Sequence, residues 1–196
     1  MIEREFQRLE EEVGACVRCP LHEKRIQAVF GTGHPFSEIM VIGEGPGEEE
    51  DRQGLPFVGK SGQLLDKILA AAGFSRDENV YIANIVKCRP PENREPAPEE
   101  RAACLPWLEE QIALIQPNII ILLGSTALKG LIDPEGKITR MRGTWIQWND
   151  IWVMPTYHPS ALLRNPDLKK EVWEDMKEVV RKYREVVDPT HKAPHL

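Results

Sequence analysis

Four short apolar runs, separated by longer segments with helical periodicity, constrain the fold of this chain most strongly. The runs cover residues 38–43, 80–86, 119–124 and 151–155. Three of them are almost continuously apolar, as expected for strands that are buried on both faces. Because strands and helices alternate along the chain, we expect an α/β fold in which helices sandwich a mostly parallel sheet of four strands.

The segments around these runs carry apolar residues at helical spacing. Expected helices cover residues 1–14, 61–72, 98–115, 125–131 and 168–183. Gly73 follows the second helix as a stop signal. Pro106 predicts a bend or a break in the third helix just after Cys104.

Length and composition indicate a single domain. A chain of 196 residues fits one domain, and no linker divides it. We expect residues 1–187 to form this domain and residues 188–196, which hold two prolines and no apolar cluster, to form a flexible tail. No apolar run approaches the roughly 18 residues that span a bilayer, and the charged N-terminus has no apolar signal segment. These features exclude membrane and secreted proteins and predict a cytoplasmic protein.

The four cysteines are Cys16, Cys19, Cys88 and Cys104. In a reducing compartment they indicate a metal site or unrelated core thiols, not disulfides. A turn between Cys16 and Cys19 brings both sulfurs to one side, where they can hold one metal or two irons of a cluster. The fifteen residues between Cys88 and Cys104 are too many for a zinc-ribbon knuckle and favour a larger group. Spacing alone does not separate zinc from iron–sulfur.

Three motifs follow the predicted strands, where an α/β sheet builds its ligand site. The glycines of residues 43–47 let the backbone turn sharply and approach a ligand, although a tight turn into an acidic helix start is the simpler alternative. The proline-rich residues 89–96 predict a long surface loop. His158 begins the third motif, although a lone histidine is often structural. Leu162 and Leu163 in the same motif are either core or surface residues.

The charge distribution qualifies the net charge of −6, which by itself argues against a nucleic-acid partner. Residues 137–184 hold ten basic and six acidic side chains and can supply phosphate contacts. A solvated helical face is the simpler interpretation of the same residues.

Together and in this order, the motifs resemble the uracil-DNA glycosylase superfamily, and specifically its iron–sulfur-containing family 4. The resemblance runs from Cys16 to about Tyr183. It is carried by the four cysteines and by residues 43–47 (Gly-Glu-Gly-Pro-Gly), 56–59 (Pro-Phe-Val-Gly), Asn84 and 158–164 (His-Pro-Ser-Ala-Leu-Leu-Arg).

This resemblance implies a three-layer α/β/α sandwich with a four-stranded, mostly parallel central sheet. It implies a structural [4Fe-4S] cluster ligated by all four cysteines. The implied reaction hydrolyses the bond between uracil and deoxyribose in double- or single-stranded DNA and leaves an abasic site, in the cytoplasm at the nucleoid. No membrane partner is expected, and no particular replication or repair protein is identified.

The resemblance also implies roles for individual residues. Asn84 reads the pairing edge of uracil, and Phe57 stacks on the base. Glu44 and Gly45 line the pocket, and His158 donates a hydrogen bond to uracil O2, which stabilises the leaving anion. Further residues act around the base: Glu50 excludes the thymine methyl group, and Leu162, Leu163 and Arg164 form a loop that wedges into the duplex and grips phosphate.

One departure concerns water activation. The best-studied members of the superfamily place Asp in the first motif, whereas this chain has Glu44 followed by Gly45. Glu44 and Asn93 are therefore both candidates for positioning the water. In the alternative, leaving-group stabilisation dominates and an oxocarbenium-like sugar captures water late.

Three rival functions share some of these features. The first is a related glycosylase with broader deaminated-base specificity, acting on hypoxanthine or mismatched thymine. The second is a non-enzymatic iron–sulfur electron carrier, which leaves Asn84, Phe57 and His158 unexplained. The third is a zinc-stabilised nucleotide-binding module, whose purified protein would lack the brown colour of a cluster.

Overall fold

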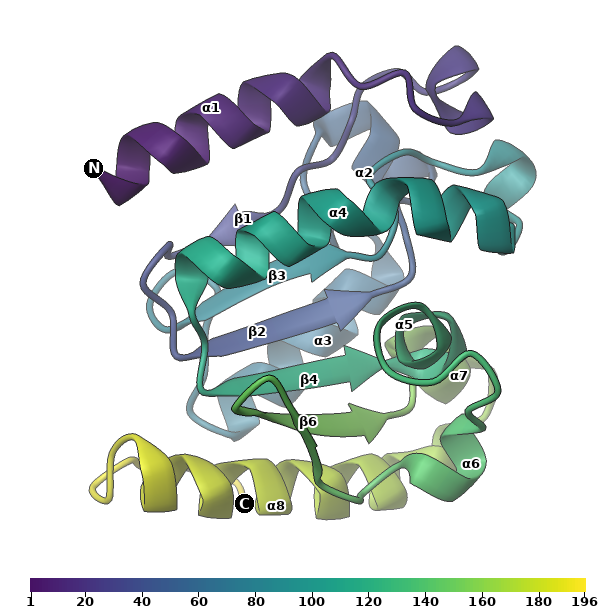
Figure 1. The fold of residues 1–196 in the computed structure, drawn as a ribbon. Coiled ribbons are helices and arrows are strands. Elements are labelled where there is room, and N and C mark those ends of the chain that lie inside the picture. The colour runs from purple at the N-terminus through teal and green to yellow at the C-terminus, as the bar shows by residue number, and fades with distance from the viewer.

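A six-stranded sheet forms the centre of the fold (Figure 1). The computed structural model describes residues 1–196. The strand order is β1-β3-β2-β4-β6-β5. The strands are β1 (Thr32–Gly33), β2 (Ile39–Gly43), β3 (Val80–Asn84), β4 (Ile119–Leu123), β5 (Ile146–Trp148) and β6 (Ile151–Thr156).

The four inner strands are the four predicted ones, and they are parallel to one another. β1 and β5 add antiparallel edges that the sequence did not indicate. The predicted α/β sandwich is confirmed, and the count of four strands is corrected to six. The edge strands are two and three residues long, so they are too short to show a period of two.

Helices cover both faces of the sheet and give three layers. They are α1 (Ile2–Gly14), α2 (Glu48–Gln53), α3 (Lys60–Ala71), α4 (Pro98–Ile115), α5 (Gly124–Leu131), α6 (Ile138–Met141), α7 (Pro159–Arg164) and α8 (Lys169–Val186), with 3-10 turns at Pro20–Glu23, Pro91–Asn93 and Pro166–Leu168. All five predicted helices form. The short helices α2, α6 and α7 were not predicted because four to six residues show too little periodicity.

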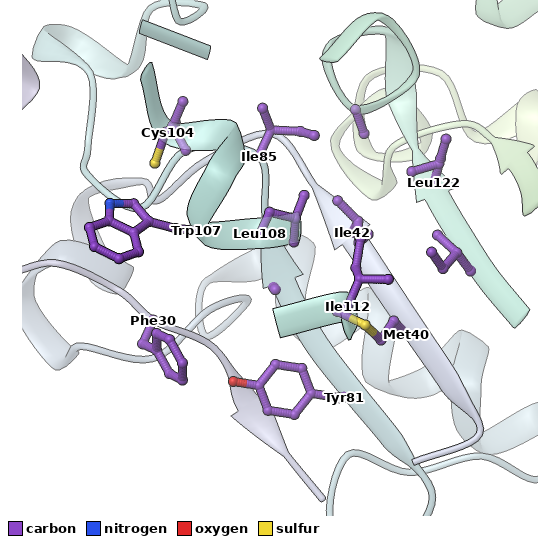
Figure 2. Packing of buried hydrophobic residues seen from close by; sticks show 14 of the residues in the cluster. Phe30, Met40, Ile42, Tyr81, Ile85, Cys104, Trp107, Leu108, Ile112 and Leu122 are labelled. Carbon is purple, nitrogen blue, oxygen red and sulfur yellow. The ribbon is translucent and has the colours of Figure 1, made fainter. Parts of the chain in front are cut away.

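The core lies in two clusters, one on each face of the sheet, because successive strand residues point to opposite sides. Met40 and Ile42 of β2 face α1, α4 and α5, whereas Ile39 and Val41 face α3, α7 and α8. Figure 2 shows the first cluster, where residues of α4 such as Leu108 pack over β2 and β3.

Pro106 does not break α4, which runs without interruption from Pro98 to Ile115. The predicted break is wrong. Proline removes one backbone N–H, whose acceptor in a regular helix would be the carbonyl of Ala102. Ala102 is exposed, so water can hydrate that carbonyl.

Residues 188–196 form no helix or strand. The His191 ring stacks on Phe74 with 4.6 Å between ring centroids, and His191 Nε2 lies 2.8 Å from the Ala72 carbonyl oxygen. The expected flexibility of this tail stays a prediction. None of the helices combines the length and the apolar character that crossing a membrane requires.

Candidate active site

A cavity of about 610 Å³ opens at the carboxyl ends of the parallel strands. Loops that follow β2, β3 and β6, together with the start of α3, surround it. Its lining includes every residue predicted to bind the base or to act in catalysis: Glu44, Gly45, Glu50, Phe57, Asn84, Asn93 and His158. The topology thus brings together residues that are more than 100 positions apart in the chain.

Asn84 is the last residue of β3 and is only 2% exposed. Its Oδ1 is the one buried side-chain polar atom without a hydrogen-bond partner. Leaving such an atom unpaired costs about 1–3 kcal/mol, so a ligand N–H that pairs with it gains affinity. The register places Gly43 beside Asn84, and a Cβ on Gly43 would lie 2.7 Å from this oxygen. A glycine is therefore required next to the amide.

Phe57 lies close to Asn84, because a Cβ on Gly43 would lie 2.5 Å from Phe57 Cζ and 2.7 Å from Asn84 Oδ1. It belongs to a turn with a left-handed backbone (φ 54°), which is rare for a bulky residue. Its ring centroid is 5.5 Å from that of His158, at an interplanar angle of 31°. The Arg76 guanidinium stabilises this turn, because it donates hydrogen bonds to the carbonyls of Pro56 (2.7 Å) and Phe57 (2.8 Å). Surrounding contacts thus offset the strain of the turn.

Glu50 ties the first motif to the Phe57 turn. Its Oε1 accepts from the Gly47 N–H at 3.0 Å, and its Oε2 accepts from the N–H groups of Val58 (2.9 Å) and Gly59 (2.8 Å). The carboxylate lines the cavity, as predicted, but its hydrogen bonds go to backbone. Its role in excluding thymine stays a prediction.

His158 precedes α7 and contacts its first turn. The backbone N–H of Ser160 donates to His158 Nδ1 at 3.0 Å, and the Ser160 hydroxyl lies 2.8 Å from the same nitrogen. A nitrogen that accepts from a backbone N–H carries no proton, so the neutral ring bears its hydrogen on Nε2. Burial, helped by the positive charge of Arg164 and opposed by the negative charge of Glu50, lowers the pKa of His158 to about 4. The ring is therefore neutral near pH 7.

Glu44 and Asn93, the two candidates for positioning water, differ in their surroundings. Burial raises the pKa of the Glu44 carboxyl, an effect that a hydrogen bond from Thr126 partly opposes. Asn93 is exposed on the proline-rich loop, where its Oδ1 accepts from Arg89 Nε at 2.7 Å. Glu44 is thus the half-buried carboxylate of the cavity, and Asn93 lies at its rim.

The three residues predicted to engage DNA, Leu162, Leu163 and Arg164, differ in their exposure to solvent. Leu162 is 2% exposed and packs in the core on the α3 side of the sheet, so its predicted place on a DNA-facing surface is wrong. Leu163 is 49% exposed, and Arg164 is exposed at the rim of the cavity. Consecutive residues of a helix point about 100° apart, which explains why one leucine is buried and the next is free.

Four of the ten basic side chains of residues 137–184 form ion pairs, and three of these pairs lie on α8. The pairs are Lys177–Glu174, Arg181–Glu178, Lys182–Glu185 and Arg142–Asp175. This pattern favours a solvated helical face over a phosphate-binding surface. Sequence reasoning instead missed Lys60 and Ser61, which line the cavity at the start of α3. A lysine directly after Gly59 was the available signal.

All four cysteines line a second cavity between the segment after α1, the segment after β3, and α4. They form no disulfide. Three of the sulfurs have N–H groups nearby: Trp107 Nε1 lies 3.2 Å from Cys16, Arg25 Nη1 3.1 Å from Cys88, and Lys87 N 3.3 Å from Cys104. No three His, Cys, Asp or Glu side chains lie close enough to hold a single metal ion. Thiolates with N–H donors are a donor set suited to an iron–sulfur cluster.

Comparison with known proteins agrees with this geometry. Residues 30–177 match the model of the uracil DNA glycosylase superfamily. A type-4 uracil-DNA glycosylase of Thermotoga maritima is 49% identical over 170 residues, which cover 85% of this chain and 88% of that protein. Type-4 uracil-DNA glycosylases of Sulfurisphaera tokodaii and Saccharolobus solfataricus are 44% and 46% identical, over 89% and 86% of this chain and 83% and 82% of their own lengths. The match covers most of the chain, including the strands that hold Asn84 and His158 at one cavity, and the chain therefore belongs to the uracil-DNA glycosylase superfamily.

Proposed function

We propose that this chain removes uracil from DNA by hydrolysing its N-glycosidic bond, which leaves an abasic site. The single observation that carries the proposal is the unpaired, buried Oδ1 of Asn84, a residue that lines the cavity together with Phe57 and His158. The names of the relatives, type-4 uracil-DNA glycosylases, support the same reaction.

Asn84 reads the base through its amide. Oδ1 accepts from N3–H of uracil while Nδ2 donates to O4, so both amide atoms are satisfied at once. Cytosine presents an unprotonated N3 and an amino group at the same positions. Each mismatch leaves a buried polar group unpaired and costs about 1–3 kcal/mol. Phe57 stacks on the base and closes the cavity behind it.

His158 stabilises the leaving group. As the glycosidic bond breaks, negative charge develops on uracil, and the Nε2–H of the neutral ring donates to O2. The contact from the Ser160 N–H to Nδ1 keeps this hydrogen on Nε2. The donor is fixed before the reaction, so no reorganisation is needed as the charge appears.

Water reaches the sugar from the side of the first motif. Glu44 is the better candidate for orienting it, because a half-buried carboxylate close to the base accepts a hydrogen bond from water and also stabilises positive charge on the sugar. Asn93 contributes from the rim. Because burial raises the pKa of Glu44, its carboxyl group ionises at a higher pH than that of an exposed glutamate.

The target base must leave the stack before it enters the cavity. Arg164 lines the cavity, and its guanidinium can bind the flanking phosphate. Leu163, the exposed residue before it, can fill the space that the base vacates. Lys60 adds a second positive charge at the same rim.

The four cysteines would hold a [4Fe-4S] cluster, one thiolate to each iron. When bound, the cluster supplies covalent links between the N-terminal segment, the segment after β3 and α4. Its role is structural, since the reaction transfers no electron. The four cysteines line one shared cavity, and four thiolates around one site are the ligand set of a [4Fe-4S] cluster.

A strand-cleavage assay tests the function. Duplex and single-stranded oligonucleotides, each with one lesion, are incubated with the holoprotein and then treated with alkali to cut at abasic sites. We expect cleavage at uracil and none at cytosine or paired thymine. Substrates with hypoxanthine and mismatched thymine define the breadth of specificity. Failure to create abasic sites in uracil-containing DNA would contradict the proposal.

A further inference from the structure

Lys87 is a lysine buried between the two cavities. It is 1% exposed and lies three residues after Asn84 and directly before Cys88. The mechanism above does not use it. A fully buried ammonium group is costly unless charged or polar partners compensate, so its partners indicate its role.

The contacts of Lys87 reach both sites. Its Nζ donates to the backbone carbonyl oxygen of Asn84 at 3.1 Å and to Gln111 Oε1 at 2.5 Å. Its backbone N–H donates to Cys104 Sγ at 3.3 Å. Gln111 is itself fully buried and donates to the Phe30 carbonyl oxygen at 2.9 Å, so the network is anchored within the core.

No carboxylate forms an ion pair with Lys87; the pairs in the structure all involve other residues. The ionisable groups that act on its charge are the sulfurs of Cys88 and Cys104. Figure 2 shows Cys104 in the core cluster that also holds Tyr81 and Phe30. Lys87 also lines the cavity of the four cysteines, whose sulfurs are anionic thiolates when they ligate a cluster.

We propose that Lys87 is a positioning residue that couples the four-cysteine cluster to base reading. Its ammonium balances the negative charge of a thiolate-ligated cluster, and the same group holds the Asn84 carbonyl at the end of β3. The peptide of Asn84 is thus fixed from the side opposite the cavity. This inference rests on the proposed roles of the cluster and of Asn84.

Two effects separate this role from simple packing. Loss of a positive charge beside an anionic cluster makes electron addition harder, so the reduction potential falls. Loss of the hydrogen bond frees the Asn84 peptide, so discrimination between uracil and cytosine weakens. A side chain that only fills space would produce neither effect.

Lys87→Met removes both charge and hydrogen bond at similar length, whereas Lys87→Gln removes the charge and keeps an N–H donor. Lys24→Met, the same substitution on an exposed lysine that does not line the cysteine cavity, is the matched control. For each anaerobically purified holoprotein, we would measure iron content, the reduction potential by spectroelectrochemical titration, and single-turnover cleavage of uracil DNA.

We expect a lower potential in both Lys87 variants and an unchanged one in Lys24→Met. Uracil cleavage should fall about tenfold or more in Lys87→Met and less in Lys87→Gln, as for loss of a hydrogen bond from a charged donor. If Lys87→Met does not fold, the potential of Lys87→Gln decides. A wild-type potential in the folded Lys87 variants overturns the proposal.

The variant Asn84→Ala distinguishes a failure of the proposed base reading from a failure of the coupling through Lys87. If Asn84→Ala still discriminates against cytosine, the base-reading role fails and the proposed coupling fails with it. If Asn84→Ala loses discrimination while Lys87→Met keeps both potential and cleavage, only the coupling through Lys87 is wrong.

Discussion

The backbone N–H of Ser160 lies 3.0 Å from Nδ1 of His158 and donates a hydrogen bond to it. This contact determines which ring nitrogen carries the proton, and it leaves Nε2–H free to serve as a donor. The tautomer of the histidine is thus set by a residue two positions further along the chain.

Replacing His158 with Ala should act on the chemical step. The lost donor matters most when charge has developed on the leaving base, so we expect single-turnover cleavage to fall about 100- to 1000-fold while DNA affinity changes little. Single-turnover kinetics are needed because slow release of abasic product can mask chemistry. His195→Ala, at an exposed histidine of the C-terminal segment, is the control. Near-wild-type cleavage with abolished binding would make His158 a DNA-positioning residue.

The lowered pKa of His158 should make the free energy of unfolding depend on pH. Its folded-state pKa of about 4 lies below the ordinary value of 6.5, so between these pH values the unfolded chain binds a proton that the folded chain does not. The free energy of unfolding should therefore fall as pH drops from 6.5 to 4, and this group should have no effect above 6.5. His158→Gln should flatten that dependence in urea unfolding series. An NMR titration of the imidazole with a midpoint near 6.5 would contradict the assignment.

Changes at Asn84 should affect recognition. In Asn84→Asp a carboxylate replaces the amide, so uracil O4 loses its donor and meets an acceptor oxygen instead, while N3–H keeps an acceptor. We expect binding of the flipped base and the cleavage rate to fall together, because the base edge is read in both states. Asn118→Asp, at the opposite end of the sheet, is a matched control. Equal cleavage by wild type and Asn84→Asp would exclude base reading by this residue.

The cysteines should bind one iron–sulfur cluster. Iron and sulfide analysis of anaerobically purified protein should give about four of each per chain. Cys16→Ser should lower the unfolding temperature as well as the iron content, because the cluster links segments that are distant in sequence. Stoichiometric zinc without iron would contradict this prediction.

DNA affinity should depend on salt and on Arg164. Removal of one phosphate contact should weaken binding to uracil and abasic DNA alike and reduce the slope of log affinity against log salt by about one. Arg181→Ala, at an arginine paired with Glu178 on α8, should leave that slope unchanged. Affinity that does not change between low and moderate salt would argue against phosphate-dominated binding.

Much of the fold follows from local pattern. The four inner strands and five helices form close to their predicted positions. Strands that are buried on both faces appear as continuous apolar runs, and helices that are buried along one side show apolar residues at helical spacing. The two edge strands and the three shortest helices leave no such signature. α4 also continues through Pro106 because its surroundings tolerate one missing hydrogen bond.

The sequence by itself determined which residues line the cavity, since motifs at the ends of parallel strands must converge on one edge of the sheet. Only the tertiary structure decided how each residue works there. It buried Leu162 and left Leu163 exposed, engaged Glu50 with three backbone amides, and left Oδ1 of Asn84 without a partner. It also enclosed Lys87 between the cysteines and Asn84. Burial, hydrogen bonding and charge depend on atoms that folding brings together from distant parts of the chain, and a linear pattern does not encode them residue by residue.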